Sequence, residues 1–354
     1  MKHQKEVKAL RILLALYILF SLLLASLNQA GSPELAQKVA PWWHVYENQF
    51  KTFLIVLCGL LTYRIVTGKG RATMHLQNFI GFFLSALMIH VLLPLFTGNP
   101  ELYFFAMPLP WTTIPLQASI PTSTFVQAHE GTLSLQGIAW ALSFFWIYSI
   151  LVAITTILFG RRVHCSHLCL FNGFAAEVFE PAIPLLGKAT HPLKKRTLRK
   201  LHYLKYLYLC IALLFTFFWL MVPHLEISAE TMLTMRSLEL FWYLLANLIL
   251  AMAFWVASVG RLYCHLCPLG TVLALLSRLG RMHIKTTNTA CIGCGSCDRA
   301  CPMSLSIMEH AKKGEPVISL ECVGCGHCVD ACPTKTLTYE TAFLQLLRKK
   351  APIH

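Results

Sequence analysis

The sequence predicts a mostly α-helical, polytopic membrane protein with about six transmembrane spans and a small C-terminal α+β domain. Hydrophobic residues make up 56% of its 354 residues, charged residues make up 13%, and the mean hydropathy is +0.58. Soluble globular proteins carry about 25% charged residues. Eight of the 14 cysteines lie between residues 291 and 332. We therefore expect most of the chain in lipid, followed by a cysteine-rich domain outside it.

Six apolar stretches are long enough to cross a hydrocarbon core of about 30 Å, which takes about 20 helical residues. They lie at about 10–27, 51–66, 77–96, 137–159, 203–223 and 241–259. The second stretch is short and carries Arg64 near its end. These stretches predict four regions: residues 1–136 with three spans and a long outward loop, 137–287 with the other three spans, 288–340 as the cysteine-rich domain, and 341–354 as a tail.

Lysine and arginine residues gather in alternate loops. They crowd the N-terminal tail and the loops after the second and fourth stretches: Lys2, Lys5, Lys8, Arg11, Arg64, Lys69, Arg71, Arg161, Arg162, Lys188, Lys194, Lys195, Arg196, Arg199, Lys200 and Lys205. The intervening loops hold only Lys38, Lys51 and Arg236. Because short basic loops stay on the cytoplasmic side of a membrane, the sequence predicts a multi-pass protein with both termini in the cytoplasm.

The basic loops also account for most of the net charge of +14. Anionic lipid headgroups attract basic segments that lie next to a membrane span. Membrane lipid is therefore an expected partner, and nucleic acid is not.

The C-terminal cysteines repeat one spacing twice. The two runs are Cys291, Cys294, Cys297 and Cys301 before Pro302, and Cys322, Cys325, Cys328 and Cys332 before Pro333. This CxxCxxCxxxCP pattern is typical of two [4Fe-4S] clusters, in which the fourth cysteine of each run binds the other cluster. We therefore expect one cluster on Cys291, Cys294, Cys297 and Cys332, and a second on Cys322, Cys325, Cys328 and Cys301.

Zinc and disulfides are the alternative interpretations of these eight thiols. Zinc sites use paired CxxC segments and need no third cysteine followed by a Cys-Pro step. Disulfides are disfavoured in a reducing compartment, which the predicted orientation gives this domain. An iron–sulfur domain of the ferredoxin kind remains the favoured interpretation.

A second repeat lies at the ends of two predicted spans. Gly160-Arg161 is followed by Cys165 and Cys169, and Gly260-Arg261 is followed by Cys264 and Cys267. Parallel repeats in membrane proteins often enclose a cofactor or substrate site. The four cysteines are therefore candidates for a third metal site or a dithiol–disulfide centre, with His167 and His265 beside them. The alternative is that they are structural thiols at helix ends.

Histidines and methionines outside the cysteine motifs give further candidates. His90 lies inside the third apolar stretch, where an ionisable residue suggests function; it is the candidate to bind a quinol hydroxyl, although a packing role is an alternative. Haem is not favoured, because no second histidine lies at the same depth. His224, Met232 and Met235 have the ligand types of a copper site, but packing on a helix face is the stronger interpretation.

The helix-end motifs together with the double ferredoxin motif resemble the membrane-bound iron–sulfur subunits of the NapH quinol dehydrogenase type, to which the accessory protein NosR is related. The resemblance covers about residues 137–340. Members typically carry two CxxxCP helix ends, from which this chain departs: Leu170 follows Cys169, and only two residues separate Cys264 from Cys267. The resemblance implies a bacterial cytoplasmic membrane protein that moves electrons from quinol towards a respiratory reductase or an electron-carrier subunit.

The leading hypothesis is thus a membrane-bound electron-transfer protein that connects the quinol pool with two [4Fe-4S] clusters and acts as a quinol dehydrogenase subunit. The direction of electron flow is left open, because the sequence does not set cluster potentials. An accessory redox factor for assembly or copper loading of a respiratory metalloenzyme is the alternative. A redox sensor is a third hypothesis.

Overall fold

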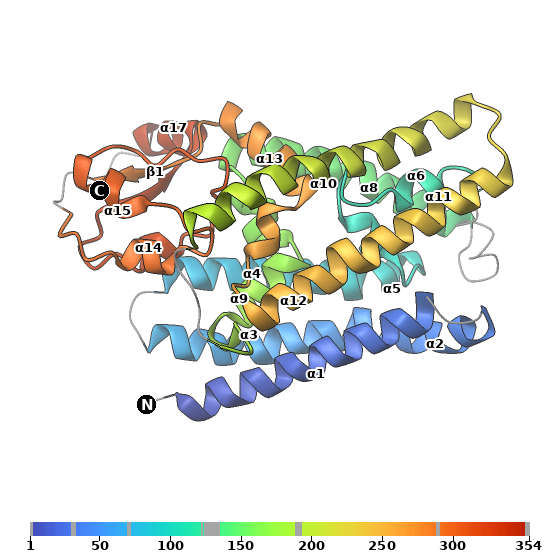
Figure 1. Ribbon diagram of the computed structural model, residues 1–354, viewed down its shortest axis with the longest axis horizontal. Helices are drawn as coiled ribbons and strands as arrows, with labels where there is room; N and C mark the ends of the chain where they lie inside the picture. The colour runs from blue at the N-terminus through green and yellow to red at the C-terminus, as the bar shows by residue number, and fades with distance from the viewer. Residues whose placement is uncertain are drawn as a thin grey trace.

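The computed structural model describes residues 3–29, 33–68, 72–121, 123, 135–187, 193–287 and 291–350. Six helical segments are long and apolar enough to cross a membrane: Gln4–Asn28, Gln37–Thr67, Thr73–Thr97, Gly137–Phe159, Lys195–His224 and Ala229–Ala257. They run side by side as a bundle, and the cysteine-rich region packs at one end of it (Figure 1). This confirms the predicted fold class of a helical membrane bundle with a small C-terminal domain.

Up to residue 257, the described residues include the α-helices α1 (Gln4–Gln29), α2 (Pro33–Val45), α3 (Lys51–Thr67), α4 (Thr73–Ala86), α5 (Leu93–Thr97), α8 (Leu135–Phe159), α9 (Asn172–Val178), α10 (Lys195–Met221), α11 (Ala229–Trp242) and α12 (Leu250–Ala257). Four π-helical turns interrupt or follow them: η1 (Tyr46–Phe50), η2 (Leu87–Leu92), η4 (Val163–Leu168) and η7 (Tyr243–Ile249). Short helices complete this part: η3 (Leu102–Ala106), α6 (Ile114–Ala118), η5 (Glu180–Ala182), η6 (Val222–His224) and η8 (Leu262–His265).

The C-terminal region contains helices and one small sheet. Its elements are α13 (Pro268–Leu279), β1 (His283–Thr286), α14 (Ser296–Ala300), α15 (Ile307–Lys313), α16 (His327–Asp330), β2 (Leu337–Glu340) and α17 (Ala342–Lys350). Strands β1 and β2 pair antiparallel, with His283 opposite Glu340 and Thr286 opposite Leu337. The expected tail therefore includes a helix, while residues 351–354 lie outside the described part.

Two spans begin more than ten residues before the stretches expected from the sequence. The second begins at Gln37 rather than 51, and the sixth begins at Ala229 rather than 241. The second span can be longer because Lys51 donates a hydrogen bond to Glu47 one turn earlier, at 2.9 Å, and both side chains are buried. Pairing lowers the cost of burying two charges in an apolar segment. Lys51 is therefore a span residue and not the loop residue that we expected.

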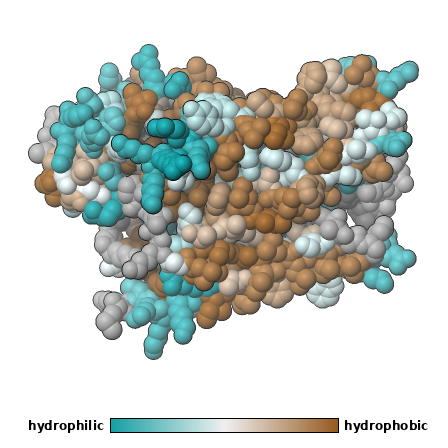
Figure 2. Space-filling model, viewed as in Figure 1, coloured by the Kyte–Doolittle hydropathy of each residue, from teal (hydrophilic) through white to brown (hydrophobic). Residues whose placement is uncertain are grey.

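The surface of the bundle is apolar along its length. Figure 2 shows a hydrophobic band between two ends where hydrophilic residues gather. Leu213, Leu214 and Phe217 on α10, and Ile147 and Ile150 on α8, are more than two-fifths exposed. An apolar surface of this extent marks a face that lipid or another apolar partner covers. The protein is therefore a multi-pass membrane protein.

The long loop after the third span folds over the bundle. Its helices η3 and α6 bury Leu102, Phe105 and Leu116 against the spans. Trp43, Tyr46 and Phe105 are buried, whereas Trp42 is 70% exposed. Residues 122 and 124–134 of this loop lie outside the described residues.

The cysteine-rich region shares one apolar core with the bundle. Val152 of α8 and Leu273 of α13 pack with Ile284, Val317 and the domain cysteines. Its side of the membrane stays a prediction, and so do the domain boundaries. The start of α1 lies at the same end of the bundle as this region (Figure 1), whereas Lys2, Lys69, Arg71 and Lys188 lie outside the described residues.

Candidate functional site

The first set of predicted cluster cysteines lines one small cavity. Cys291, Cys294 and Cys297 of the first run are joined there by Cys332 of the second run. Gly295, with a positive φ of 67°, turns the cysteine loop into α14, which carries Cys297. Glycine adopts a positive φ at little energetic cost, because it has no Cβ. The fold thus brings together the four thiols that the spacing predicts.

The second set gathers deeper, around Cys328. Burial raises the pKa of the Cys328 thiol well above its usual value, and the neighbouring Cys325, Cys301 and Cys322 raise it further. Burial also raises the pKa of Cys301 to about 11. Buried neutral thiols of this kind become ligands by losing their protons when metal binds.

The sulfur spacing argues against mononuclear zinc at any of these positions. Among the described residues, His75, Glu180 and His327 form a group of three side chains whose ligand atoms all lie within 4.8 Å of one another. It is the one such group there, and it contains no cysteine. Tetrahedral zinc with Zn–S bonds of about 2.3 Å would hold its sulfurs about 3.8 Å apart. In the part of the chain that the structure describes, no three cysteine sulfurs lie within 4.8 Å of one another.

The four helix-end thiols also come together. Cys165 lies in η4, Cys169 ends it, Cys264 lies in η8 and Cys267 begins α13. The Cys267 Sγ accepts a hydrogen bond from the Gly270 amide at 3.3 Å. Cys165 is buried, and Cys169, Cys264 and Cys267 are half-buried. Burial raises the pKa of Cys267 well above its usual value, and Cys169, Cys264 and Cys165 raise it further, so the four thiols lie close to one another.

A cavity of about 80 Å³ lies between the spans, beside this group. Aromatic and aliphatic side chains form most of its wall: Tyr17, Trp43, Ile89, Tyr103, Phe104, Ala106, Met107, Trp111, Leu168, Leu170, Phe171, Tyr243, Leu248, Met252 and Trp255. The polar residues are Ser21, Glu47, Lys51 and His90. A mostly apolar wall with a few convergent polar groups is typical of small-molecule sites.

His90 is held in this cavity with one nitrogen available. Its side chain is 2% exposed, and its ring stacks in parallel on Tyr103 at 5.7 Å between centroids. Tyr103 is in turn fixed by a 2.6 Å hydrogen bond from the Trp43 indole. Within the described residues, His90 Nδ1 has no hydrogen-bond partner. The site can therefore offer this nitrogen to a ligand.

Sequence reasoning missed Glu47, Lys51 and Tyr103 as cavity residues. Glu47 and Lys51 are four residues apart in an apolar region, a spacing that pairs opposite charges on a helix. That signal could have identified them as an intramembrane pair. Tyr103 gave no comparable signal, because it reaches the cavity only when the loop folds back.

The burial of Met232 and His224 bears on the alternative copper interpretation. Met232 is buried in an apolar cluster with Leu116 and Trp219, and His224 is exposed. This arrangement agrees with the packing interpretation of Met232. Cys58 is buried in the bundle core.

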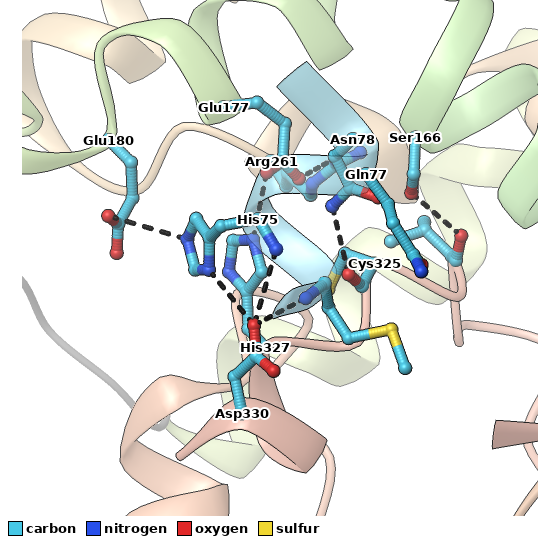
Figure 3. Close-up of polar contacts among 12 residues, drawn as sticks. His75, Gln77, Asn78, Ser166, Glu177, Glu180, Arg261, Cys325, His327 and Asp330 are labelled. Carbon is cyan, nitrogen blue, oxygen red and sulfur yellow. Dashed lines mark hydrogen bonds and ion pairs between the residues drawn. The ribbon is translucent and has the colours of Figure 1, made fainter. Parts of the chain in front are cut away.

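A polar network fastens the second cysteine run to the membrane helices (Figure 3). Glu177 of α9 pairs with Arg261 and with His327, whose Nε2 lies 3.0 Å from the carboxylate. Burial alone would raise the pKa of Glu177, but His327 and Arg261 outweigh burial and lower it well below the usual value. The His75 ring stacks on His327 at 3.9 Å. The Asn78 amide donates to the Cys325 carbonyl at 2.9 Å.

Two protein-family models match the segments that contain the cysteine motifs. The model described as a 4Fe-4S dicluster domain matches residues 283–333. A second model, described as a 4Fe-4S binding domain, matches residues 138–181 and 240–287. The chain therefore contains segments that match 4Fe-4S binding domains, at the residues that carry the cysteine motifs.

Three curated proteins match parts of the chain. The methylamine utilization ferredoxin-type protein MauN of Methylobacillus flagellatus is 29% identical over 44% of this chain and 53% of its own length. Two uncharacterized proteins of Methanocaldococcus jannaschii are 27% and 24% identical, over 48% and 49% of this chain. The chain spans 63% and 71% of these two relatives. No solved structure matches it.

Proposed function

We propose that the protein transfers electrons between a quinol or quinone bound in the cavity and two [4Fe-4S] clusters in the C-terminal region. The observation that carries this proposal is the buried, unpartnered Nδ1 of His90 in an aromatic cavity between the spans. A hydroquinone combines a flat apolar ring with hydroxyl groups, so it matches both the wall and the nitrogen. The proposed ligand sets are those expected from the sequence: Cys291, Cys294, Cys297 and Cys332, and Cys322, Cys325, Cys328 and Cys301.

The chemistry requires acceptors for both protons and electrons. A hydroquinone that becomes a quinone loses two protons and two electrons. His90 Nδ1 and the Glu47 carboxylate, which both line the cavity, are the proposed proton acceptors. The clusters supply one-electron transfer when bound. The protein fixes the quinol, excludes water and holds the protons.

The π-helical turns support the cavity as a functional site. Each of the four described π turns contributes a cavity residue, among them Glu47 from η1, His90 from η2, Leu168 from η4 and Tyr243 from η7. Single π turns are frequent at functional sites because they reorient side chains within a helix. Four such turns around one cavity would be an unusual coincidence if it only served packing.

The wider setting follows from the resemblance to the NapH and NosR type. We propose a bacterial cytoplasmic membrane location with cytoplasmic termini. The electron partner at the cluster end would be a respiratory reductase or an electron-carrier subunit. The ferredoxin-type description of MauN agrees with an electron carrier as the class of partner.

The test is the rate at which a quinol bleaches the cluster absorbance in reconstituted membranes. The variant His90→Phe keeps a ring on Tyr103 but removes the nitrogen. Its rate should fall by about 10²-fold or more, the usual range for loss of a positioned acid–base group. The control His224→Phe alters an exposed histidine at the end of a span and should leave the rate unchanged.

Other outcomes would contradict the proposal. If quinol does not bleach the wild-type clusters, or if His90→Phe is as fast as wild type, the cavity is not the quinol site. The absence of any quinol response together with loss of copper from a partner enzyme would favour the accessory role in metal loading.

A further inference from the structure

The four helix-end thiols are not used by the two ferredoxin clusters. Cys165 is 8% exposed, and Cys169, Cys264 and Cys267 are half-buried. Thiols that exchange with disulfides usually lie at accessible positions. A group with this little exposure is poorly placed for dithiol exchange with a partner protein. Its chemistry has to be explained in another way.

Two buried arginines surround these thiols. The Arg161 and Arg261 side chains are 2% and 0% exposed. Arg261 pairs with Glu177 and donates to the Cys165 carbonyl at 2.9 Å. Among the described residues, Arg161 has no carboxylate within 4.0 Å; it donates to the Leu320 carbonyl at 2.8 Å. The Glu321 carboxylate acts on Arg161 only from beyond 4.0 Å. A buried cation without a directly paired anion costs several kcal/mol, so a further negative charge close to Arg161 would stabilise it.

The thiols themselves can supply that negative charge. A Cβ placed on Gly270 would lie 2.8 Å from Arg161 Nη2 and 3.6 Å from Cys267 Sγ, so the Arg161 guanidinium lies beside this group. Four thiolates around a cluster would carry a net negative charge. The repeated Gly-Arg step before each cysteine pair thus places one arginine from each helix end beside the group.

Hydrogen-bond donors also point at the sulfur atoms. The Asn172 amide donates to Cys264 Sγ at 3.1 Å, and the Gly270 amide donates to Cys267 Sγ. N–H donors to thiolate sulfur set the potential of iron–sulfur clusters. Neutral structural thiols need no such set of donors.

We propose that Cys165, Cys169, Cys264 and Cys267 hold a third iron–sulfur centre at the end of the membrane bundle. Zinc does not fit the spacing, because no three of the cysteine sulfurs lie within 4.8 Å of one another. Both cysteine pairs fall within the segments that match the 4Fe-4S binding model, which does not assign individual ligands. The centre is independent of the ferredoxin ligand sets.

Its position explains how electrons would cross from the cavity to the ferredoxin region. Leu168 and Leu170, on either side of Cys169, line the cavity. On the other side, Ser166 donates to the Val323 carbonyl at 3.2 Å, next to Cys322. The relay role rests on the proposed quinol function: each electron would pass singly through the centre, while both protons stay with the cavity residues. The existence of the centre does not depend on it.

The experiment counts iron and sulfide in the full-length protein, purified anaerobically and reconstituted until the iron content is constant. Two cubanes account for eight irons per chain; a third centre raises the count to ten for a [2Fe-2S] or twelve for a [4Fe-4S] cluster. The variant Cys165→Ala/Cys264→Ala removes one thiol from each pair. It should return to eight irons and lose one electron paramagnetic resonance signal.

The control Cys58→Ala/Cys210→Ala removes two thiols from apolar helices and should keep the wild-type count. If the wild-type protein binds only eight irons per chain, the third centre does not exist, regardless of the iron content of the variants. Zinc bound at these four thiols would also overturn it. Because iron is counted without quinol, a failure of quinol to reduce the protein would contradict the proposed function and leave this result intact.

Discussion

At the residue scale, Gly160 sets how the C-terminal region meets the fourth span. Its φ of +78° ends α8, and a Cβ at this position would lie 2.3 Å from the Tyr339 hydroxyl and 2.5 Å from Met282 Sδ. The Tyr339 hydroxyl donates to the Phe159 carbonyl at 2.6 Å. The glycine thus allows strand β2 to approach the helix end closely.

The variant Gly160→Ala should loosen this contact. A left-handed conformation costs a residue with a Cβ roughly 1–2 kcal/mol, and the clash with Tyr339 adds to that. Gly98→Ala is a matched control, because Gly98 has a φ of +64° with nothing within 4 Å. Protease cleavage between the spans and the C-terminal region should rise more in Gly160→Ala than in Gly98→Ala. Equal cleavage would show that the close approach does not matter.

Some site residues could be predicted from the sequence, and others could not. The eight ferredoxin cysteines could be predicted because cluster ligands follow one another at short, regular spacing. Glu177 could not: it lies in a short helix whose residues are all buried, and it pairs with Arg261 across 84 positions. Pairing at that distance depends on the tertiary fold, for which local spacing carries no signal.

At the element scale, the spans are α-helices interrupted by π turns. Hydropathy located all six spans, because length and apolar character are local properties. It could not locate the π turns, since they do not change composition. It also shortened the second span by treating Lys51 as a loop residue. The cavity depends on these turns, so the sequence predicted the bundle but not the wall of the site.

Deletion of Met88 from η2 tests this dependence. Removing one residue would convert the π turn to a regular α-helix, so that residues within the turn, His90 among them, change their direction around the helix axis. His90 would then turn away from the cavity, and quinol-dependent bleaching should fall as in His90→Phe while the iron content is retained. The substitution Met88→Ala keeps the chain length and alters an exposed side chain, so it should have little effect. A deletion variant with the wild-type rate would contradict the role of the turn.

At the scale of the whole molecule, the C-terminal region is fastened to the bundle by buried polar contacts. Glu177 joins Arg261, beside the helix-end thiols, to His327, beside the second ferredoxin set. Lys205 of α10 adds a 2.7 Å ion pair with Glu321, next to Cys322. These contacts hold the cysteine groups in a fixed order, as electron transfer between them requires.

Substitution of Glu177 by Gln should therefore weaken the whole assembly. It leaves Arg261 buried without its carboxylate, which costs about 3–5 kcal/mol in comparable buried pairs. The pKa of Glu177 is lowered below its usual value of 4.5, so its stabilising charge is fully present above that pH and is lost only as the pH falls below it. The difference between wild type and Glu177→Gln in the temperature at which cluster absorbance disappears should thus be the same at pH 6 and pH 8. The comparison is repeated with the substitution His327→Gln present in both the reference protein and the Glu177→Gln variant, which removes any contribution from that histidine. A second control, Glu309→Gln, alters an exposed ion pair with Lys313 and should have little effect at either pH. A difference that shrinks at pH 6 in the His327→Gln background would mean that Glu177 gains its proton near neutrality, contrary to the proposed ion pair.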